Sequence, residues 1–404
     1  MKVIYTDNNA TTRVDPLVLE EMLPYLTDYY GNPSSMHSFG GNVGRKVKEA
    51  RTRVADLLGA SLDEVLMTSC GTESDSSAIL SALRTQPGRR HVITTRVEHP
   101  AVKSLCEHLA QNGYRVTFVP VDRQGRLDMD YLVDHLSDDT AIVSVMWANN
   151  ETGVIFPVEE IAREAKKHGS LFHTDAVQAV GKIPINLKDN AIDMLSLSGH
   201  KLHGPKGIGA LFVRKGTPFT PFMIGGHQEH GRRAGTENVA SIIGLGKASE
   251  LSAQRMDDEN TRVKALRDRL EAGLTHRVPQ TIVNGDLENR LPNTSSISFE
   301  YVEGESILLM MDQHGICASS GSACTSGSLE PSHVLRAMGI PFTAAHGTIR
   351  FSLSIFNTEE EMDFIIDKLP PIIERLREMS PFWKQAQSGG AIVEPEQAHV
   401  ACAR

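Results

Sequence analysis

The sequence predicts an α/β protein, with a mainly parallel central sheet in a large domain and a smaller α+β domain after it. Between about residues 91 and 214, short apolar runs alternate with longer amphipathic stretches, which is typical of βαβ units. A long charged helix follows, and beyond it the pattern changes to separate strands and helices. The length of 404 residues is enough for one large domain and a subsidiary one.

The strands predicted for the large domain are short apolar runs. They are HVITT (91–95), RVTFVPV (115–121), AIVSVMW (141–147), SLFHTDA (170–176), DMLSLS (193–198) and IGALFVR (208–214). Amphipathic helices are predicted between them, through Leu105 and Leu109 and over about residues 158–168. In a parallel sheet of this kind, ligands bind beyond the carboxyl ends of the strands. The carboxyl edge is therefore where we expect a site.

A second region begins with an amphipathic helix over about residues 244–276 that is rich in Glu, Lys and Arg. After it come the predicted elements TSSISFE (294–300), EPSHVLRAMG (330–339), TIRFSLS (348–354) and a closing helix over Glu359–Met379. We predict a large domain over 16–259, a small domain formed by 1–15 and 260–385, and a disordered tail over 386–404.

Charge and composition exclude several classes of function. The net charge is −9 and no long run of Lys or Arg occurs, which argues against binding to nucleic acid or to an anionic membrane. No apolar stretch approaches the roughly 18 residues of a membrane span, and the start, MKVIYTDNNATT, lacks the apolar core of a secretory signal. We therefore expect a cytoplasmic protein.

Polar residues stand at or just beyond the ends of four predicted strands. They are His99, Asn150, Asp175, Ser198, His200 and Lys201. Upstream, Gly71 and Thr72 precede a helix predicted to start at Glu73, where backbone N–H groups and the helix dipole can hold a phosphate. The alternative is an ordinary helix cap made by Thr72, and the sequence leaves both interpretations open.

A lysine between two glycine-containing turns gives the strongest indication of chemistry. Lys201 lies in SGHKLHGPKG (198–207) at a strand end, where partial desolvation lowers the pKa of its amine and makes it a nucleophile toward an aldehyde. Asp175 can pair with a protonated ring nitrogen, as a pyridoxal cofactor requires. Phosphate loop, aspartate and lysine together predict a pyridoxal-phosphate site. His99 either lies over the ring or is a structural histidine, and Gln178 and Asn150 either reach the ring hydroxyl or cap helices.

One cysteine lies in a run of small residues, ASSGSACTSGS (318–328). Such a run offers almost no apolar surface, so we expect a mobile loop that lets Cys324 move between two reaction partners. Of the five cysteines, Cys70, Cys106 and Cys317 are interpreted as small buried hydrophobes and Cys402 as an exposed thiol in the tail. No close pair of cysteines occurs, which predicts reduced thiols rather than disulfides or a zinc knuckle.

Ten segments of the chain resemble the cysteine desulfurases of the class V aminotransferase group. The matching segments are DNNATT (7–12), GNPSSMHSFG (31–40), TSCGTESDS (68–76), EHPAV (98–102), WANNETG (147–153), HTDAVQAVGK (173–182), SGHKLHGPKG (198–207), GRRAGTEN (231–238), SSGSACTSGSLEPSHVLRAMG (319–339) and GTIRFSLS (347–354). The resemblance covers roughly residues 3–385. In the motifs CGTESDS and MWANNETG, the chain most resembles the members of the family that are dedicated to nitrogenase.

The resemblance implies a homodimer of fold-type-I pyridoxal-phosphate-dependent subunits. The roles it implies around the ring are a covalent link to the cofactor for Lys201, pairing with the pyridine nitrogen for Asp175, proton transfer above the ring for His99, and contact with the ring hydroxyl for Gln178 and Asn150. The implied phosphate ligands are Gly71, Thr72, Ser198 and His200, with Thr236 from the other subunit. Arg350 and Asn150 would bind the substrate, Arg350 by its carboxylate.

The reaction that the resemblance implies converts L-cysteine to L-alanine and transfers the sulfur to Cys324 as a persulfide. An iron–sulfur scaffold protein would accept the sulfur, for nitrogenase in particular. The family implies no intrinsic metal ion, although Cys324 would contact an iron–sulfur cluster during transfer, and the spacing of His227 and His230 lacks a third ligand. Two alternatives remain open from the sequence, a related pyridoxal enzyme such as a selenocysteine lyase or an aminotransferase, and a non-catalytic scaffold.

Overall fold

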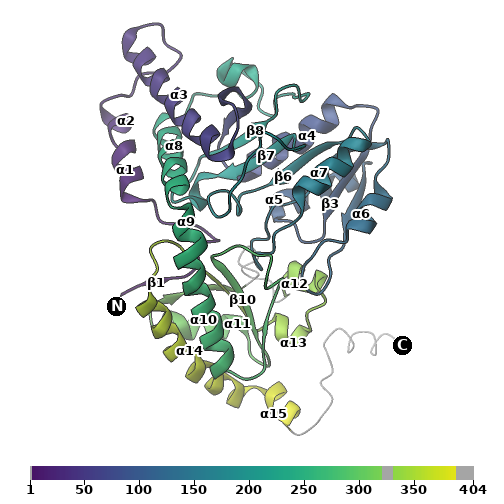
Figure 1. Cartoon of the computed structure of the whole chain (residues 1–404), viewed down its shortest axis with the longest axis vertical. Coiled ribbons are helices and arrows are strands. Elements are labelled where there is room, and N and C mark those ends of the chain that lie inside the picture. Colours follow the sequence, from purple (N-terminus) through teal and green to yellow (C-terminus); the bar gives the residue numbers. More distant parts are fainter. Residues whose placement is uncertain (1, 321–330, 388–404) are drawn as a thin grey trace.

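The computed structural model describes residues 2–320 and 331–387. A seven-stranded sheet forms the centre of its upper part (Figure 1) and has the strand order β2-β8-β7-β6-β5-β3-β4. The strands are β2 (Val65–Thr68), β3 (His91–Thr95), β4 (Arg115–Val119), β5 (Thr140–Ser144), β6 (Leu171–Asp175), β7 (Met194–Ser198) and β8 (Gly209–Val213). Strands β3 to β7 pair in parallel, and β8 pairs antiparallel with both β7 and the edge strand β2. The predicted α/β class with a mainly parallel sheet is confirmed.

All six strands predicted for this sheet are present, but β5 ends earlier than expected. It stops at Ser144, whereas the prediction extended to Trp147. The backbone beyond it still follows β6, because Val145 and Trp147 donate hydrogen bonds to the carbonyl oxygens of His173 and Asp175. Asn150 consequently lies in a turn beyond the strand. Strand β2, with four residues, was not predicted.

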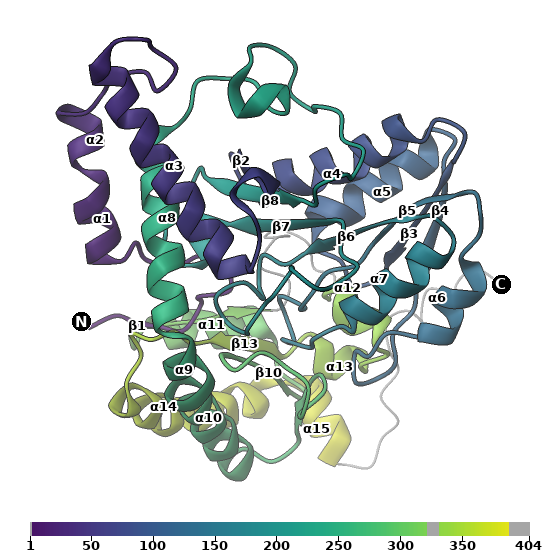
Figure 2. The same ribbon diagram turned by 45° about the horizontal axis from the view of Figure 1, so that its top comes forward.

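Helices cover both faces of the sheet, as Figure 2 shows. Buried side chains of α4 (Gly71–Thr85) and α5 (Pro100–Gln111) form one core against the sheet. On the other face, α3 (Ser38–Leu58), α7 (Val158–Lys167) and α8 (Val239–Gln254) form a larger core, with α1 (Pro16–Met22), α2 (Pro24–Thr27) and α6 (Met129–His135) at its margin. The sequence analysis did not predict the N-terminal helices α1 to α3, and the start of α3 contains two consecutive glycines that weaken its helical pattern.

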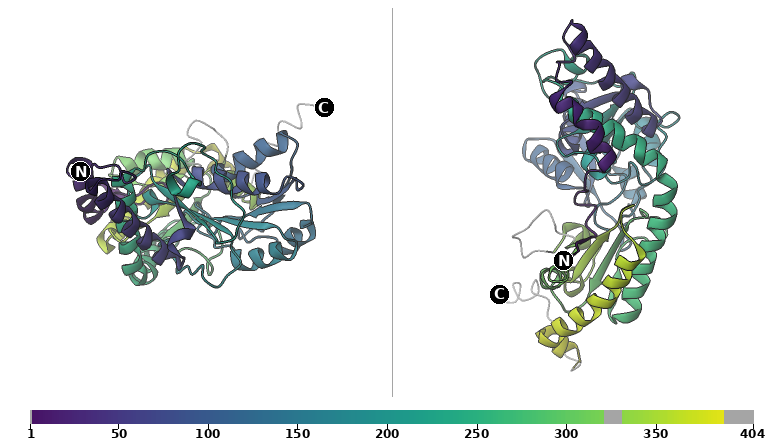
Figure 3. Two further views of the ribbon diagram at one scale, coloured as in Figure 1. Left: turned by 90° about the horizontal axis from the view of Figure 1, so that it is seen from above. Right: turned by 90° about the vertical axis from the view of Figure 1, so that its left-hand side faces the viewer.

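One long helical column joins the two parts of the molecule (Figure 3). It consists of α8, α9 (Met256–Asp258), the π-helical turn η4 (Glu259–Val263) and α10 (Lys264–Arg277). The helix predicted over 244–276 is therefore present, but it begins earlier and is interrupted by the π turn. At this turn, buried Lys182 donates to the carboxylate of Glu259 at 2.9 Å, so the column is attached to the large core where its winding changes.

A second core forms below the first. Its four-stranded antiparallel sheet has the order β12-β13-β10-β9, and β1 pairs in parallel with β11 beside it. The elements are β1 (Ile4–Tyr5), β9 (Thr281–Val283), β10 (Thr294–Phe299), α11 (Gly304–Asp312), β11 (Ile316–Cys317), β12 (Ser319–Ser320), α12 (His333–Ala337), α13 (Phe342–Ala345), β13 (Thr348–Ser352), α14 (Glu359–Met379) and α15 (Pro381–Gln387).

The second core contains Ile4 together with apolar residues from Val263 to Ile373. From these separate cores we propose the division into 16–259 and 1–15 with 260–385. Helix α15 extends through Gln387, and the rest of the tail predicted over 386–404 lies outside the described residues. Among the described helices, none combines the length and apolar character that crossing a membrane requires.

Candidate active site

A cavity of about 370 Å³ opens at the carboxyl ends of β6 and β7. Ten of the twelve residues predicted to form the site line it. These ten are Gly71, Thr72, His99, Asn150, Asp175, Gln178, Ser198, His200, Lys201 and Arg350. Thr236 is exposed and lies outside this cavity, and Cys324 lies outside the described residues.

Two adjacent parallel strands place the acid and the lysine of the cavity. Asp175 ends β6, and Lys201 lies in the short helix η2 (Gly199–Lys201) that follows β7. The Oδ1 atom of Asp175 accepts a hydrogen bond from the Val177 backbone N–H at 2.9 Å. Burial raises the pKa of Asp175, and its interactions with His99 and Lys201 oppose this shift. A cationic ring nitrogen beside Asp175 would likewise favour its charged form.

The N-terminus of α4 forms one end of the cavity. The helix begins at Gly71 and not at Glu73 as predicted, so Thr72 lies in its first turn. Of the two interpretations left open for Thr72, the helix cap is therefore excluded. Cys70 occupies the N-cap position without making a side-chain cap bond. A Cβ atom on Gly71 would lie 2.9 Å from Val177 Cγ2, so any larger residue here would force the Val177 side chain to move. The uncapped backbone N–H groups of this turn are suited to an anion.

Ser198 adds a second indication of an anion at the same place. Its Oγ atom is buried and has no hydrogen-bond partner among the described residues. A buried hydroxyl without a partner costs free energy, which a bound ligand atom would recover. His200 is less available, because its Nδ1 lies 3.1 Å from Thr11 Oγ1 and burial lowers its pKa to about 4.

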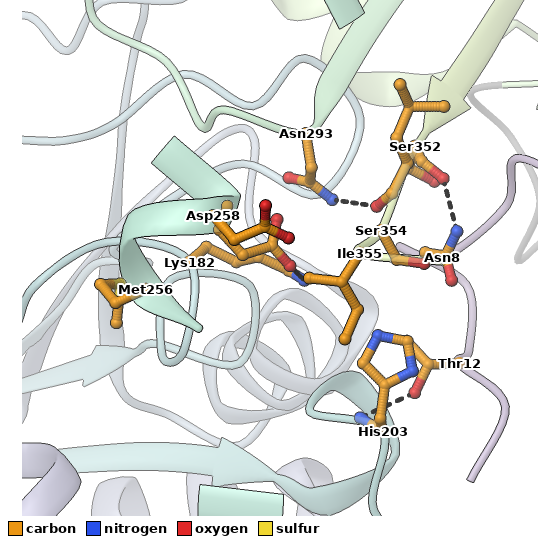
Figure 4. Close-up of polar contacts among 12 residues, drawn as sticks. Asn8, Thr12, Lys182, His203, Met256, Asp258, Asn293, Ser352, Ser354 and Ile355 are labelled. Carbon is orange, nitrogen blue, oxygen red and sulfur yellow. Dashed lines mark hydrogen bonds and ion pairs between the residues drawn. The ribbon is translucent and has the colours of Figure 1, made fainter. Parts of the chain in front are cut away.

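The segment of residues 7–12, which we call the strap, lines one side of the cavity with Asn9 and Ala10. Lys201 Nζ donates to the carbonyl oxygens of Asn9 and Ala10, the latter at 2.7 Å, and Gln178 Nε2 donates to Asn9 O at 3.0 Å. The strap is itself fixed on both sides (Figure 4): Asn8 Nδ2 donates to Ser352 O at 2.9 Å, and His203 N donates to Thr12 Oγ1 at 2.9 Å. The motif DNNATT therefore orients the lysine.

His99 is the N-cap residue of α5 and faces the same cavity. Its Nδ1 accepts a hydrogen bond from Ala101 N at 3.2 Å. Burial lowers the pKa of His99, although Asp175 opposes this. In a neutral ring whose Nδ1 accepts, the proton is on Nε2, and Nε2 is the nitrogen left to exchange a proton.

Arg350 reaches the cavity from β13, in the second part of the molecule. It is 200 residues from Asn150 in the sequence, yet its Nη1 donates to Asn150 O at 3.0 Å. Its Nη2 donates to Asp7 Oδ1 at 2.8 Å. Asn9 Nδ2 also donates to Asn150 O, at 3.2 Å. The cavity is therefore bounded by both parts of the chain.

Sequence reasoning missed an acid in the cavity lining. Asp75 lines the cavity with its carboxylate buried, and its Oδ1 lies 3.5 Å from Nε2 of buried His173. Burial raises the pKa of Asp75 well above its usual range, and the nearby charge of Asp175 adds to the shift. A usable signal was present in the sequence, because Asp75 precedes Ala78 and Ile79 by helical spacing and so falls on the buried face of α4.

Only one of the three described cysteines is buried, whereas the sequence predicted burial for all three. Cys106 is buried, and burial raises the pKa of its thiol to about 12. Cys70 and Cys317 are only partly buried, and Cys70 lines the cavity, so interpreting both as buried hydrophobes is wrong. Each lies at the end of a strand or helix and not in its middle. Within residues 2–320 and 331–387, no cluster of three or more potential His, Cys, Asp or Glu metal ligands occurs.

Comparison with known proteins identifies the family. The model of the family described as aminotransferase class-V matches residues 4–365. The cysteine desulfurase NifS of Azotobacter vinelandii is 62% identical over 399 residues, which cover 98% of each chain. The chain belongs to the cysteine desulfurases of the class-V aminotransferase family. Members of this family are enzymes that depend on pyridoxal phosphate.

Solved structures of cysteine desulfurase relatives have the same fold. A NifS-like protein is 40% identical, with a TM-score of 0.87, and the match covers 93% of this chain and 100% of that one. A structure of SspA in complex with cysteine is 34% identical, with a TM-score of 0.77, and covers 88% and 99% of the two chains. Both likenesses extend over the large part and the small part of this chain, so the predicted fold class is confirmed.

The residues present fit pyridoxal phosphate. The unpartnered Ser198 hydroxyl and the uncapped α4 N-terminus suit its phosphate, and Asp175 suits a protonated pyridine nitrogen. Lys201 supplies an amine in the same cavity. The donor set thus matches all three reactive parts of this cofactor.

Proposed function

We propose that this protein releases the sulfur of L-cysteine, leaves L-alanine and transfers the sulfur to Cys324 as a persulfide. The observation that supports this most strongly is the convergence of Lys201, Asp175 and the unpartnered Ser198 hydroxyl in one cavity of a cysteine desulfurase fold. The relative named SspA was solved in complex with cysteine, which favours the same substrate here.

Each residue of the cavity has a proposed role. Gly71, Thr72, Ser198 and His200 would hold the phosphate, and Asp175 the pyridine nitrogen. Gln178 and Asn150 would address the ring hydroxyl, and Lys201 would carry the cofactor. When bound, pyridoxal phosphate supplies an electron sink next to the substrate α-carbon. Lys201 and His99, the latter through Nε2, would move protons at the substrate carbons. Arg350 would bind the substrate carboxylate.

The sulfur transfer needs one thiolate and no outside oxidant. The Cys324 thiolate attacks the γ-sulfur, a sulfur–sulfur bond forms, and the carbon–sulfur bond of the substrate breaks. Its electron pair stays with the carbon, which takes up a proton and becomes the methyl group of alanine. Cys324 lies outside the described residues, so its assignment rests on the small-residue motif and on the family.

The decisive test replaces Cys324 by alanine. We expect the variant to bind pyridoxal phosphate with unchanged absorbance and to respond spectrally to L-cysteine, but to release neither alanine nor sulfide above background. In the wild type, mass spectrometry after brief exposure to L-cysteine should find one added sulfur on the peptide that contains Cys324. Alanine at Cys106, which is buried, serves as the control. A persulfide found chiefly on Cys317 or Cys402 would contradict the assignment.

We further propose a cytoplasmic homodimer in which Thr236 completes the partner's phosphate site. Thr236 follows Arg233, whose Nε donates to Glu73 at 2.9 Å in the first turn of α4, so its segment starts beside a phosphate site. Mixing Lys201→Ala subunits with Thr236→Ala subunits should restore activity, because one of the two sites then has neither change. Verified heterodimers without activity would count against a shared site.

The acceptor of the sulfur is proposed from the family. An iron–sulfur scaffold protein, serving nitrogenase in particular, would take the persulfide sulfur from Cys324. The name NifS of the relative with 62% identity supports this acceptor. Incubating the persulfide form with a purified scaffold protein should move labelled sulfur to it, and a transfer rate no greater than that to a small thiol would argue against a dedicated partner.

A further inference from the structure

Two protein groups hold the guanidinium of Arg350 in the cavity of the candidate active site, here also called the crevice. Its Nη1 donates to Asn150 O at 3.0 Å, and its Nη2 donates to Asp7 Oδ1 at 2.8 Å. The side chains of Arg350 and Asp7 are 3% and 19% exposed, so water screens this ion pair little. Nε of Arg350 is buried and has no hydrogen-bond partner among the described residues.

The backbone of Asp7 is held in place by two contacts. The hydroxyl of Tyr5 donates to Asp7 O at 3.2 Å and to Thr11 O at 2.8 Å, which bridges the strap. Asp7 also forms a parallel backbone bridge with Ser352, two residues beyond Arg350 on β13. Since both backbones are held in register, the carboxylate of Asp7 and the guanidinium of Arg350 meet as a consequence of the fold.

The pair has two consequences for a substrate carboxylate. An arginine has five N–H donors, and the two bonds to protein groups leave others for a ligand. The charge of Asp7 also cancels much of the attraction that Arg350 exerts on a second anion. A ligand with only a carboxylate depends on Arg350 alone, whereas an amino acid is also held through its amine.

We propose that Asp7 is a positioning and specificity residue for the substrate carboxylate. It orients the guanidinium of Arg350 and lowers the affinity of the crevice for carboxylates that have no amine. The crevice is thereby kept free of ordinary metabolite anions and remains available to a zwitterionic amino acid. This inference rests on the proposed function, because it requires Arg350 to bind the carboxylate of the substrate.

The test compares two half-substrates on the holoenzyme. β-Mercaptopropionate has the thiol and carboxylate of L-cysteine without the amine, and cysteamine has the thiol and amine without the carboxylate. We expect Asp7→Asn to bind β-mercaptopropionate about tenfold more tightly, because asparagine keeps the Oδ1 acceptor and removes only the charge. Cysteamine binding should stay unchanged. Calorimetry, together with the absorbance of the bound cofactor, gives both dissociation constants.

A double-mutant cycle connects the effect to Arg350. Arg350→Gln should weaken β-mercaptopropionate binding at least about tenfold, and Asp7→Asn should have no further effect in that background. The control is Asp286→Asn, which removes a carboxylate from Arg126 at 2.6 Å outside the crevice and should change neither constant. If Asp7→Asn leaves β-mercaptopropionate binding unchanged or weaker, the inference is overturned. Should this variant fail to load the cofactor, Asp7→Ser provides the same comparison.

The same experiment separates this inference from the proposed function. If Arg350→Gln does not weaken β-mercaptopropionate while the wild type still forms alanine and a Cys324 persulfide, the inference is wrong and the desulfurase function stands. If the wild type does not convert L-cysteine, the proposed function is wrong. The coupling between Asp7 and Arg350 in carboxylate binding then still decides whether the pair controls anion affinity.

Discussion

The two walls of the crevice are built in different ways. The wall formed by α4 and the ends of β6 and β7, here called the sheet wall, places Gly71, Asp175, Ser198 and Lys201 at the ends of regular elements. The opposite wall consists of the strap and β13, where Asn9 and Arg350 meet Asn150 through single long-range hydrogen bonds. The backbone positions of the sheet-wall residues follow from the order of the strands, although the strap orients the Lys201 side chain. The strap wall needs both parts of the molecule to be packed.

This difference separates two tasks. The sheet wall carries the groups suited to the cofactor. Parallel strands end at the same edge of the sheet, so residues at their carboxyl ends lie close together regardless of the segments that follow. The strap wall carries the arginine suited to the substrate carboxylate, together with its acidic partner Asp7. Changes on the sheet wall should therefore abolish chemistry, and changes on the strap wall should mainly alter substrate affinity and stability.

The largest effect is expected on the sheet wall, at Lys201. We expect Lys201→Ala to lower turnover of L-cysteine by at least about a thousandfold, since no other lysine among the described residues lines the cavity. The cofactor should no longer be trapped by borohydride reduction, and far-ultraviolet circular dichroism should be unchanged. Lys215→Ala, beyond β8, is the matched control. If Lys201→Ala still has a borohydride-reducible cofactor and normal turnover, the proposal that changes on the sheet wall abolish chemistry is wrong.

On the strap wall, a change at Arg350 should act on affinity. Arg350→Lys keeps the charge but loses the planar fork, so we expect the KM for L-cysteine to rise about tenfold while kcat falls less. Steady-state kinetics with alanine as the measured product distinguishes the two constants. If kcat falls by the larger factor, the arginine acts on the chemical step, and the proposed division of tasks is wrong.

Asn9 tests how far the strap wall depends on tertiary packing. Its side chain donates to Asn150 O at 3.2 Å and to Thr294 Oγ1 at 2.9 Å, and accepts from Asn293 Nδ2 at 3.1 Å. Asn9→Ala leaves these buried groups without a partner, which should lower the free energy of unfolding by about 2–3 kcal/mol in urea titrations. Exposed Asn112→Ala should cost much less.

The smallest effect concerns a buried acid behind the sheet wall. Burial raises the pKa of Glu98 from 4.5 to about 8, and its Oε1 accepts hydrogen bonds from Thr95 and Met146. A raised folded-state pKa contributes stability below about pH 4.5 that is lost as the pH rises to about 8. Glu98→Gln should therefore reduce the loss of stability between about pH 7 and pH 9 by on the order of 1 kcal/mol in urea titrations.

The control for this pH effect is Glu107→Gln on the exposed side of α5, where the carboxylate pairs with Lys103. It should leave the pH dependence of unfolding unchanged. A Glu98→Gln variant with the pH dependence of the wild type would mean that other buried groups, such as Asp75, dominate this range. The pH dependence of stability near the sheet wall would then come from Asp75 on α4 and not from Glu98, which follows β3.

Sequence reasoning succeeded on the sheet wall because its signals are local. Apolar runs of five to seven residues located β3 to β8, and the polar residues that follow them were assigned to one edge before any contact was known. It failed where a boundary depends on contacts. Thr72 has the side chain of a good cap, yet α4 begins two residues before the predicted Glu73, and Gly71 lies close against Val177.

The sequence by itself determined the fold class, the family and the residues suited to a pyridoxal cofactor, because periodicity and motif spacing are properties of neighbouring residues. Only the tertiary structure decided that the strap orients Lys201 and that Asp7 pairs with Arg350. The last contact joins residues 343 positions apart. Contacts over such separations depend on how the two cores pack, and no local pattern in the chain specifies them.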